Sequence, residues 1–231
     1  KNMKSMKVIS IAAALMMITY GLSAQISLGL KGGYYQSNIQ TTEGLGTITP
    51  DFLALDNFTI GAVAEVPLLS NLYFQPELNY TVKGFGLTAN ADVDVFNTPL
   101  PIGAEARSKF HYLDVPLLAK AKFGQQAVQF YITAGPSFGY ALSGEVETIA
   151  RALVEFKVSD SPINLESINY ERFEVSGIVG AGLNIDLKFV QLFADARYQH
   201  GFTELYDIPF AEERIRNRGV ALSAGFMVPL Q

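Results

Sequence analysis

The chain has 231 residues, a formal net charge of −5 and no cysteine. Charged residues make up only 17% of it, below the roughly 25% typical of soluble domains. Without cysteine there are no disulfides, thiolate metal sites or cysteine nucleophile. The acidic balance argues against a nucleic-acid partner. No apolar run of about 18 residues follows the N-terminal region, which excludes a helical membrane bundle.

The N-terminal segment has the organisation of a secretory signal peptide. Lys1, Lys4 and Lys7 precede an apolar run that extends from Val8 to Leu22, and small residues follow it. A positive flank, a short apolar core and small residues at the end define such a signal. We therefore predict a signal peptide over residues 1–24 and a mature domain over residues 25–231.

The rest of the chain alternates between apolar and polar residues with a period of two. Residues 74–83 show this best, because Phe74, Leu78 and Val82 fall on one face of an extended strand. Gln75 and Lys83 fall on the other. The same pattern predicts eight strands, at residues 26–39, 57–68, 72–84, 110–123, 128–141, 172–187, 190–200 and 218–230.

The connections between these strands alternate strictly between tight and long. The tight ones lie near residues 70–71, 124–127 and 187–189, and the long ones at 40–56, 85–109, 142–171 and 201–217. Tight periplasmic turns and long outer loops are the usual anatomy of an outer-membrane barrel. We therefore predict an all-β fold, an eight-stranded antiparallel up-and-down transmembrane β-barrel with four long outer loops.

Aromatic residues gather at both ends of the predicted strands. Near the long connections lie Tyr34, Phe58, Tyr80, Tyr140, Tyr198 and Phe202, and near the tight turns Phe74, Phe123, Phe130, Phe189 and Phe226. Two such belts mark the two membrane interfaces. The alternative is a soluble, lipocalin-like barrel with its apolar face inside. The belts, the low charge content and the long loops favour lipid outside.

Several segments resemble a known family. Residues 74–80 read FQPELNY, residues 111–120 read HYLDVPLLAK and residues 134–140 read AGPSFGY. These resemble the outer-membrane β-barrel family common in Bacteroidota, often labelled porin family or PorT-like. The resemblance covers most of the mature chain and implies an eight-stranded barrel in the bacterial outer membrane. PorT-like relatives serve in protein secretion.

If lipid lies outside, the polar strand face lines the lumen. Its charged residues are Lys31, Glu65, Glu77, Lys83, Asp114, Lys120, Lys122, Arg172, Glu174, Asp186, Asp195, Arg197 and Arg218. Charges removed from bulk water must be paired, so their near-balance predicts a filled lumen. An eight-stranded barrel is only wide enough for side chains to fill. A relay or a selectivity filter is the alternative.

Four prolines fall inside predicted strands, namely Pro67, Pro76, Pro116 and Pro136. Proline cannot donate to a strand ladder, and a closed barrel has no free edge to hold it. We therefore expect bulges or ladder ends at these positions.

The sequence offers little chemistry. His111 and His200 are the only histidines and fall near the long-connection ends. Some outer-membrane barrels deacylate lipid A with a His, Ser and Glu set near this rim, but beside His200 stands Thr203, not serine. No metal-ligand spacing occurs. Glycines at 32–33 and 180–182 lack the setting of a phosphate loop and fit a crowded barrel wall. We predict no catalytic, metal-binding or cofactor-binding residue, and no cofactor.

Three functions remain open. The first is a monomeric structural, adhesive or partner-binding barrel that acts through its outer loops. The second is a component of a transport or secretion system, or a narrow pore. The third is a lipid-modifying enzyme. The acidic segment 142–171 could bridge through divalent cations to lipopolysaccharide or bind an envelope or secretion protein. It could also be a solvated loop.

Overall fold

The computed structural model describes residues 26–40, 52–95, 98–124, 127–151, 155–167, 170–203 and 216–230. The predicted signal peptide lies outside these residues. The described part contains the strands β1 (Ser27–Gln40), β2 (Phe52–Pro67), β3 (Leu72–Val95), β4 (Thr98–Phe123), β5 (Val128–Arg151), β6 (Glu155–Ile163), β7 (Phe173–Asp186), β8 (Gln191–Gly201) and β9 (Arg216–Pro229). No helix in this part is long and apolar enough to cross a membrane.

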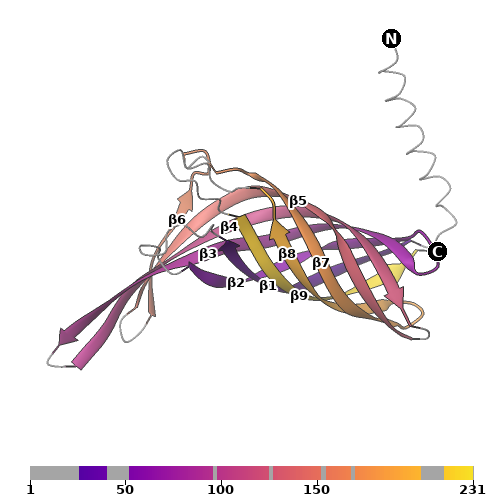
Figure 1. Ribbon diagram of the computed structural model, residues 1–231, viewed down its shortest axis with the longest axis horizontal. Coiled ribbons are helices and arrows are strands. Elements are labelled where there is room, and N and C mark those ends of the chain that lie inside the picture. The colour runs from indigo at the N-terminus through magenta and orange to yellow at the C-terminus, as the bar shows by residue number, and fades with distance from the viewer. Residues whose placement is uncertain are drawn as a thin grey trace, which may run out of the picture.

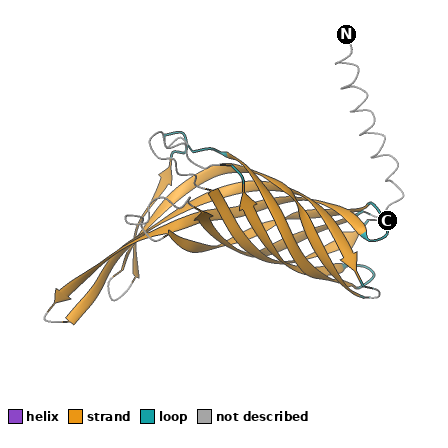
Figure 2. Cartoon of the chain, in the orientation of Figure 1, coloured by secondary structure: helices purple, strands orange, loops and turns teal. Residues whose placement is uncertain are grey.

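Eight of these strands close into a barrel (Figures 1 and 2). β1 pairs antiparallel with both β2 and β9, and β4 pairs with β5. The ring then continues from β5 through β7 and β8 to β9. The predicted fold class is confirmed, and only β6 lies outside the wall.

Three strands run far beyond the barrel. β3, β4 and β5 are 24 to 26 residues long, and the β3–β4 ladder continues as far as the pair Val95↔Thr98. β6 adds to β5 beside this extension. Figure 1 shows the β3–β4 hairpin projecting from one end of the barrel. The prediction of long loops at residues 85–109 and 142–171 is therefore wrong for most of their length. Strand pairing satisfies the backbone N–H and C=O groups of these segments instead.

The opposite end of the barrel carries the tight turns. Leu68 and Leu69 both donate backbone N–H bonds to the carbonyl of Leu72, at 2.9 and 3.0 Å. Gly124 opens the turn after β4 with φ of 109°, a conformation that favours glycine. The backbone N–H of Leu230 bonds the carbonyl of Ile26 at 2.7 Å. Both ends of the barrel domain therefore lie on the tight-turn side.

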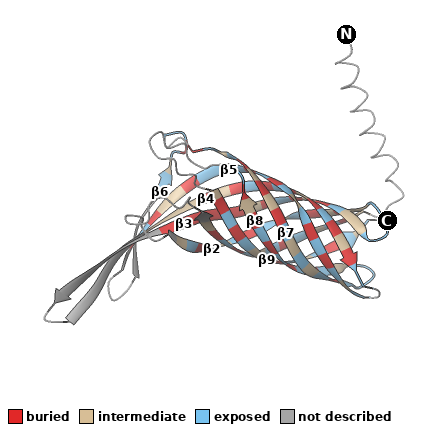
Figure 3. Ribbon diagram, viewed as in Figure 1, coloured by how far each residue is buried: buried red, intermediate tan, exposed pale blue. Residues whose placement is uncertain are grey.

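Burial along the strands follows the two-residue alternation, and many of the buried residues are polar or charged. In β8, Asp195 and Arg197 are buried while Leu192 and Tyr198 are exposed. The alternating bands in Figure 3 repeat this around the wall. An apolar outer wall around a polar interior is the reverse of a soluble ligand-binding barrel, so the lipocalin-like alternative is wrong.

Three of the strand prolines are accommodated by gaps in the ladder. Between β3 and β4 the paired residues pass from Pro76↔Leu117 directly to Asn79↔Asp114. Between β4 and β5 the paired residues pass from Pro116↔Ser137 directly to Ala119↔Ala134, and Pro136 lies in this gap. The register is the same on both sides of each gap, so these are interrupted ladders and not bulges. Pro67 is the last residue of β2, where no further bond is needed.

Candidate functional site

The lumen of the barrel is filled by buried charged side chains. Those of the described residues that lie inside the barrel are five cations and five anions: Lys31, Lys83, Lys120, Lys122 and Arg197, with Glu65, Glu77, Asp114, Glu174 and Asp195. Each belongs to the inward-facing positions of its strand. They form three groups along the barrel axis, and the total formal charge is zero. A further buried carboxylate, that of Glu147, lies where β5 pairs with β6 and forms an ion pair with Lys109 at 2.7 Å.

The first group lies at the tight-turn end. The carboxylate of Glu65 on β2 forms an ion pair with Lys120 of β4 at 2.8 Å and another with Lys122. The ammonium of Lys120 lies 4.0 Å from the ring centre of Tyr131, and that of Lys122 lies 4.2 Å from the ring centre of Tyr73. The aromatic faces add a favourable electrostatic contact, so one carboxylate can hold two cations.

The second group is centred on Glu77 of β3. Its carboxylate receives Lys31 at 2.6 Å and Arg197 at 2.9 and 3.0 Å. Arg197 also bonds Asp195 at 2.6 Å, and Asp195 accepts a hydrogen bond from the Tyr131 hydroxyl at 2.9 Å. The group therefore ties β1, β3, β5 and β8 together across the middle of the lumen.

The third group lies nearer the long-connection end. Lys83 donates to Asp114 at 2.9 Å and to Glu174 at 3.4 Å. Asn217 of β9 also donates to Glu174, at 2.7 Å. Lys83 lies 4.3 Å from the ring centre of Tyr112. This group carries one more carboxylate than cation, and the group at the tight turns carries one more cation.

An apolar cap covers the lumen beyond Lys83. It consists of Phe85, Phe110, Tyr112, Ala141, Leu165 and Tyr170. Tyr170 stacks on Phe110 with ring centres 4.5 Å apart, and its hydroxyl meets that of Tyr112 at 2.6 Å. Leu165 and Tyr170 belong to the connection between β6 and β7. This connection thus closes the end of the barrel that carries the projecting strands.

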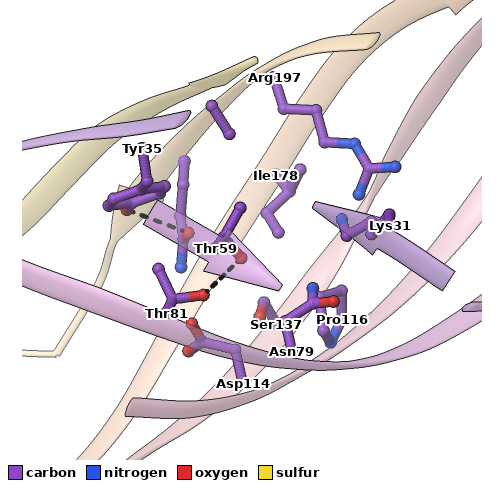
Figure 4. Close-up of a pocket in the computed structure, with 12 residues that line it drawn as sticks. Lys31, Tyr35, Thr59, Asn79, Thr81, Asp114, Pro116, Ser137, Ile178 and Arg197 are labelled. Atoms are coloured by element: carbon purple, nitrogen blue, oxygen red, sulfur yellow. Dashed lines mark hydrogen bonds between the residues drawn. The ribbon is translucent and has the colours of Figure 1, made fainter. Parts of the chain in front are cut away.

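A small cavity remains between the second and third groups (Figure 4). Its volume is about 30 Å³, and Lys31, Asp114 and Arg197 contribute to its walls. Asn79 Oδ1 and Ser137 Oγ also border it without a hydrogen bond to any described residue. A cavity of this size with polar walls accommodates one or two water molecules. It is too small for a solute.

Glycines create the room that the lumen side chains occupy. A Cβ atom on Gly139 would lie 2.5 Å from Asp114 Oδ1, and one on Gly182 would lie 2.5 Å from Cζ of Tyr131. One on Gly180 would lie 2.7 Å from Cγ of Arg197. Each glycine stands beside a residue that builds one of the charged groups.

Three residues predicted for the lumen lie elsewhere. Arg172 precedes β7 at the capped end, half-buried, 3.7 Å from the exposed carboxylate of Glu166. Asp186 is exposed and accepts the backbone N–H of Lys188 at 2.8 Å within a tight turn. Arg218 is exposed on the outer wall, where it shares the parity of Val220. Arg172 and Asp186 lie at the two ends of β7, where the two-residue alternation no longer fixes the direction of the side chain. Arg218 was assigned to the wrong face of β9.

The predicted belt residues lie on the outside of the wall, where most are strongly exposed. The exposed ones are Tyr34, Phe58, Phe74, Phe123, Phe130, Tyr140, Phe189, Tyr198, Phe202 and Phe226. Tyr80 is half-buried because its hydroxyl bonds His111 Nδ1 at 2.5 Å. Their contact with membrane interfaces stays a prediction.

The two histidines lie at the capped end and face outward. His111 lies 3.6 Å from Glu145. His200 stacks on Tyr198 and meets Phe202 edge-on. Within the described residues, neither histidine bonds a serine side chain. Those residues also contain no group of three His, Asp or Glu that could hold a metal ion.

Sequence reasoning did not find the apolar cap. Phe85 and Phe110 share the inward parity of Lys83 and Tyr112. Phe85 lies one residue beyond the predicted end of its strand, and Phe110 is the first residue of the next predicted strand. That shared parity was the available signal. No such signal in the sequence marked Leu165 and Tyr170, because a connection between strands has no periodic pattern.

A family described as "Outer membrane protein beta-barrel domain" matches residues 20–207. The chain belongs to this family. The barrel is therefore an outer-membrane protein, and its location is the bacterial outer membrane. Outer-membrane barrels place short turns on the periplasmic side and long segments outside the cell, so we call the capped end with the projecting strands the outer end.

Solved structures of outer-membrane proteins match most of the chain at low identity. Neisserial surface protein A is 16% identical, with a TM-score of 0.44, over 88% of this chain and 97% of its own. Ail of Yersinia pestis is 16% identical, with a TM-score of 0.40, over 88% and 99%. A major outer membrane protein from Thermus thermophilus is 11% identical, with a TM-score of 0.43, over 90% and 100%. No match was found among curated protein sequences.

Proposed function

We infer that this barrel does not conduct solutes and that it holds a protein partner through the strands that project from its outer end. The observation that carries this proposal is the open sheet formed by β3, β4, β5 and β6 beyond the rim (Figure 1). A plain membrane anchor needs strands of only about 9–11 residues. Here β4 has 26 residues.

The edge of this sheet offers a way to bind. Within the described residues, β6 pairs with β5 and with no other strand. In the part of the chain that the structure describes, β2 accompanies β3 only as far as Leu87, so the tip of β3 is a second edge there. An unpaired strand edge presents N–H and C=O groups that an extended segment of another protein can complete. A projecting sheet with two such edges suits partner binding.

The filled lumen supports the non-conducting half of the proposal. Three groups of ion pairs and an apolar cap occupy successive levels of the barrel. A solute would have to separate buried pairs such as Lys31 and Glu77, which are costly to leave uncompensated. The same residues brace the wall from which the sheet projects.

The partner that we expect is an envelope or secretion protein. The resemblance of residues 111–120 to PorT-like barrels supports this choice, and a monomeric barrel leaves the sheet edges free for such a partner. We also propose that the barrel has no enzymatic activity. Mass spectrometry of lipid A before and after expression tests this, and a new or lost acyl chain would contradict it.

Site-specific photocrosslinking tests the partner proposal. Benzoylphenylalanine replaces Ser161, an exposed residue of β6, and in a matched control it replaces Leu192, an exposed residue on the outer wall of β8. We expect a discrete crosslinked protein from position 161 and none from position 192. Absence of any product at position 161 in cells that make the folded barrel would overturn the proposal. A product with the mass of two chains would contradict the monomer.

A further inference from the structure

The outer wall of the barrel is uncharged from the tight turns almost to the outer rim. Along β9 the exposed outward residues are Val228, Phe226, Ala224, Leu222 and Val220, and the next outward residue is Arg218. The other described barrel strands likewise carry uncharged outward residues until this level. A lipid-facing charge is costly at the bilayer midplane and cheap near the interface. The first charged residues therefore mark the level of the outer headgroups.

Most ionisable side chains at this level already have a partner. Asp56 accepts hydrogen bonds from Tyr34 and, at 3.1 Å, from Gln36. His111 bonds Tyr80 and lies 3.6 Å from Glu145. Arg218 differs, because it is exposed and has no ion pair or hydrogen bond to another described side chain.

The surroundings of Arg218 add donors and aromatic surface. In the ladders it stands opposite His200 of β8 and Asn38 of β1. Arg216 lies two residues away along β9, on the same face, but already has a partner of its own. His200 is held between Tyr198 and Phe202, with ring centres 6.3 and 5.7 Å away. The rim over β8 and β9 is thus basic, with aromatic side chains directly beside it.

We propose that Arg218, with His200 beside it, binds the phosphate of an outer-leaflet lipid. A guanidinium presents a planar fork of N–H donors that matches phosphate oxygens. Tyr198 and Phe202 lie beside it, where amphipathic rings contact the boundary between headgroup and acyl chain. The position on the lipid-facing parity excludes a ligand inside the lumen. This site is separate from the projecting sheet and does not depend on the partner proposed above.

Lipid selectivity measured by electron spin resonance tests the site. The full-length mature barrel is placed in phosphatidylcholine bilayers that contain spin-labelled phosphatidic acid or, for comparison, spin-labelled phosphatidylcholine. We expect the wild-type protein to prefer phosphatidic acid about fivefold, the effect of one basic residue near an anionic lipid surface. Arg218→Gln should bring the ratio close to one, and Arg218→Lys should keep part of it.

Arg172→Gln is the matched control, since Arg172 is also a cation of the outer end but lies beside Glu166. It should leave the preference unchanged. Heat-modifiable migration on SDS gels verifies that each variant is folded. A wild-type ratio near one, or an unchanged ratio in Arg218→Gln, would overturn the proposal. Loss of the preference in Arg172→Gln would also overturn it, because the effect would then be general charge and not a site.

Discussion

At the scale of single residues, the lumen depends on carboxylates that serve more than one cation. Glu77 holds Lys31 and Arg197, and Glu65 holds Lys120 and Lys122. Removing one partner of a buried pair leaves the other charge uncompensated, which costs more than the pair contributed. These shared carboxylates are therefore the most sensitive positions of the barrel.

Glu77→Gln should lower the free energy of unfolding by about 3 to 5 kcal/mol, because Lys31 and Arg197 keep their charges and lose their common carboxylate. Urea unfolding in detergent, followed by circular dichroism, measures the change. Glu166→Gln is the control, because the Glu166 side chain is 84% exposed and should change stability little. Equal stability of Glu77→Gln and the wild type would contradict the structural role given to this group.

Gly139 stands between two carboxylates that both bind Lys83. It pairs in register with Asp114 on one side and with Glu174 on the other. Gly139→Val should displace Asp114 and destabilise the barrel by about 1 to 3 kcal/mol, the usual cost of overpacking. Ala134→Val, at an exposed outward position of the same strand, should be nearly neutral. The same unfolding measurement compares them, and a neutral Gly139→Val would mean that the site has spare room.

At the scale of the elements, the barrel has two unlike ends. One end has tight turns such as residues 68–71, and the other has the projecting strands and the connection that carries Leu165 and Tyr170. The strand prolines interrupt the ladder without shifting its register, so the alternation of faces survives them. The orientation of the two ends across the membrane follows from this asymmetry.

Cysteine labelling checks that orientation, and the chain has no cysteine of its own. Ser167→Cys lies in the connection after β6 and Ser70→Cys in the turn before β3, and both positions are exposed. A membrane-impermeant maleimide should label Ser167→Cys in intact cells. It should label Ser70→Cys only after the outer membrane is permeabilised. The reverse pattern would place the projecting sheet in the periplasm.

At the scale of the whole molecule, the barrel is polar inside and apolar outside. Its five lumen cations and five lumen anions balance, so the interior needs no counter-ion from solvent. The remaining cavity of about 30 Å³ is enclosed by the second and third charged groups. The charged groups fill the middle of the lumen, and the apolar cap covers its outer end.

Planar bilayer recordings test this closure. We expect no stable unitary current from the purified barrel at moderate voltage, because ion pairs and the apolar cap block each level of the lumen. A known open porin in the same bilayer is the positive control. Steady, large unitary currents from the barrel would contradict a filled lumen.

The sequence by itself determined the barrel, because a two-residue period records the two faces of each strand directly. From residues 74–83 and their counterparts came the strand count, the outward aromatics and ten inward charges, among them Glu77 and Arg197. Each is a local property of an extended chain. The alternation also includes Phe110, the first residue of its expected strand, and continues into Phe85, just past the expected end of the strand before it.

Only the tertiary structure decided which charges meet. Arg197 and Glu77 are 120 residues apart, and their contact depends on barrel closure and on the stagger of strands that are not neighbours. The sequence also did not separate Arg172 and Asp186 from the lumen, because the period breaks at strand ends and turns. Arg218 follows the period with Val220 and was assigned to the wrong face of β9. The pairing of β6 with β5 and the cap over Lys83 arise from long-range packing, which has no periodic signature in the chain.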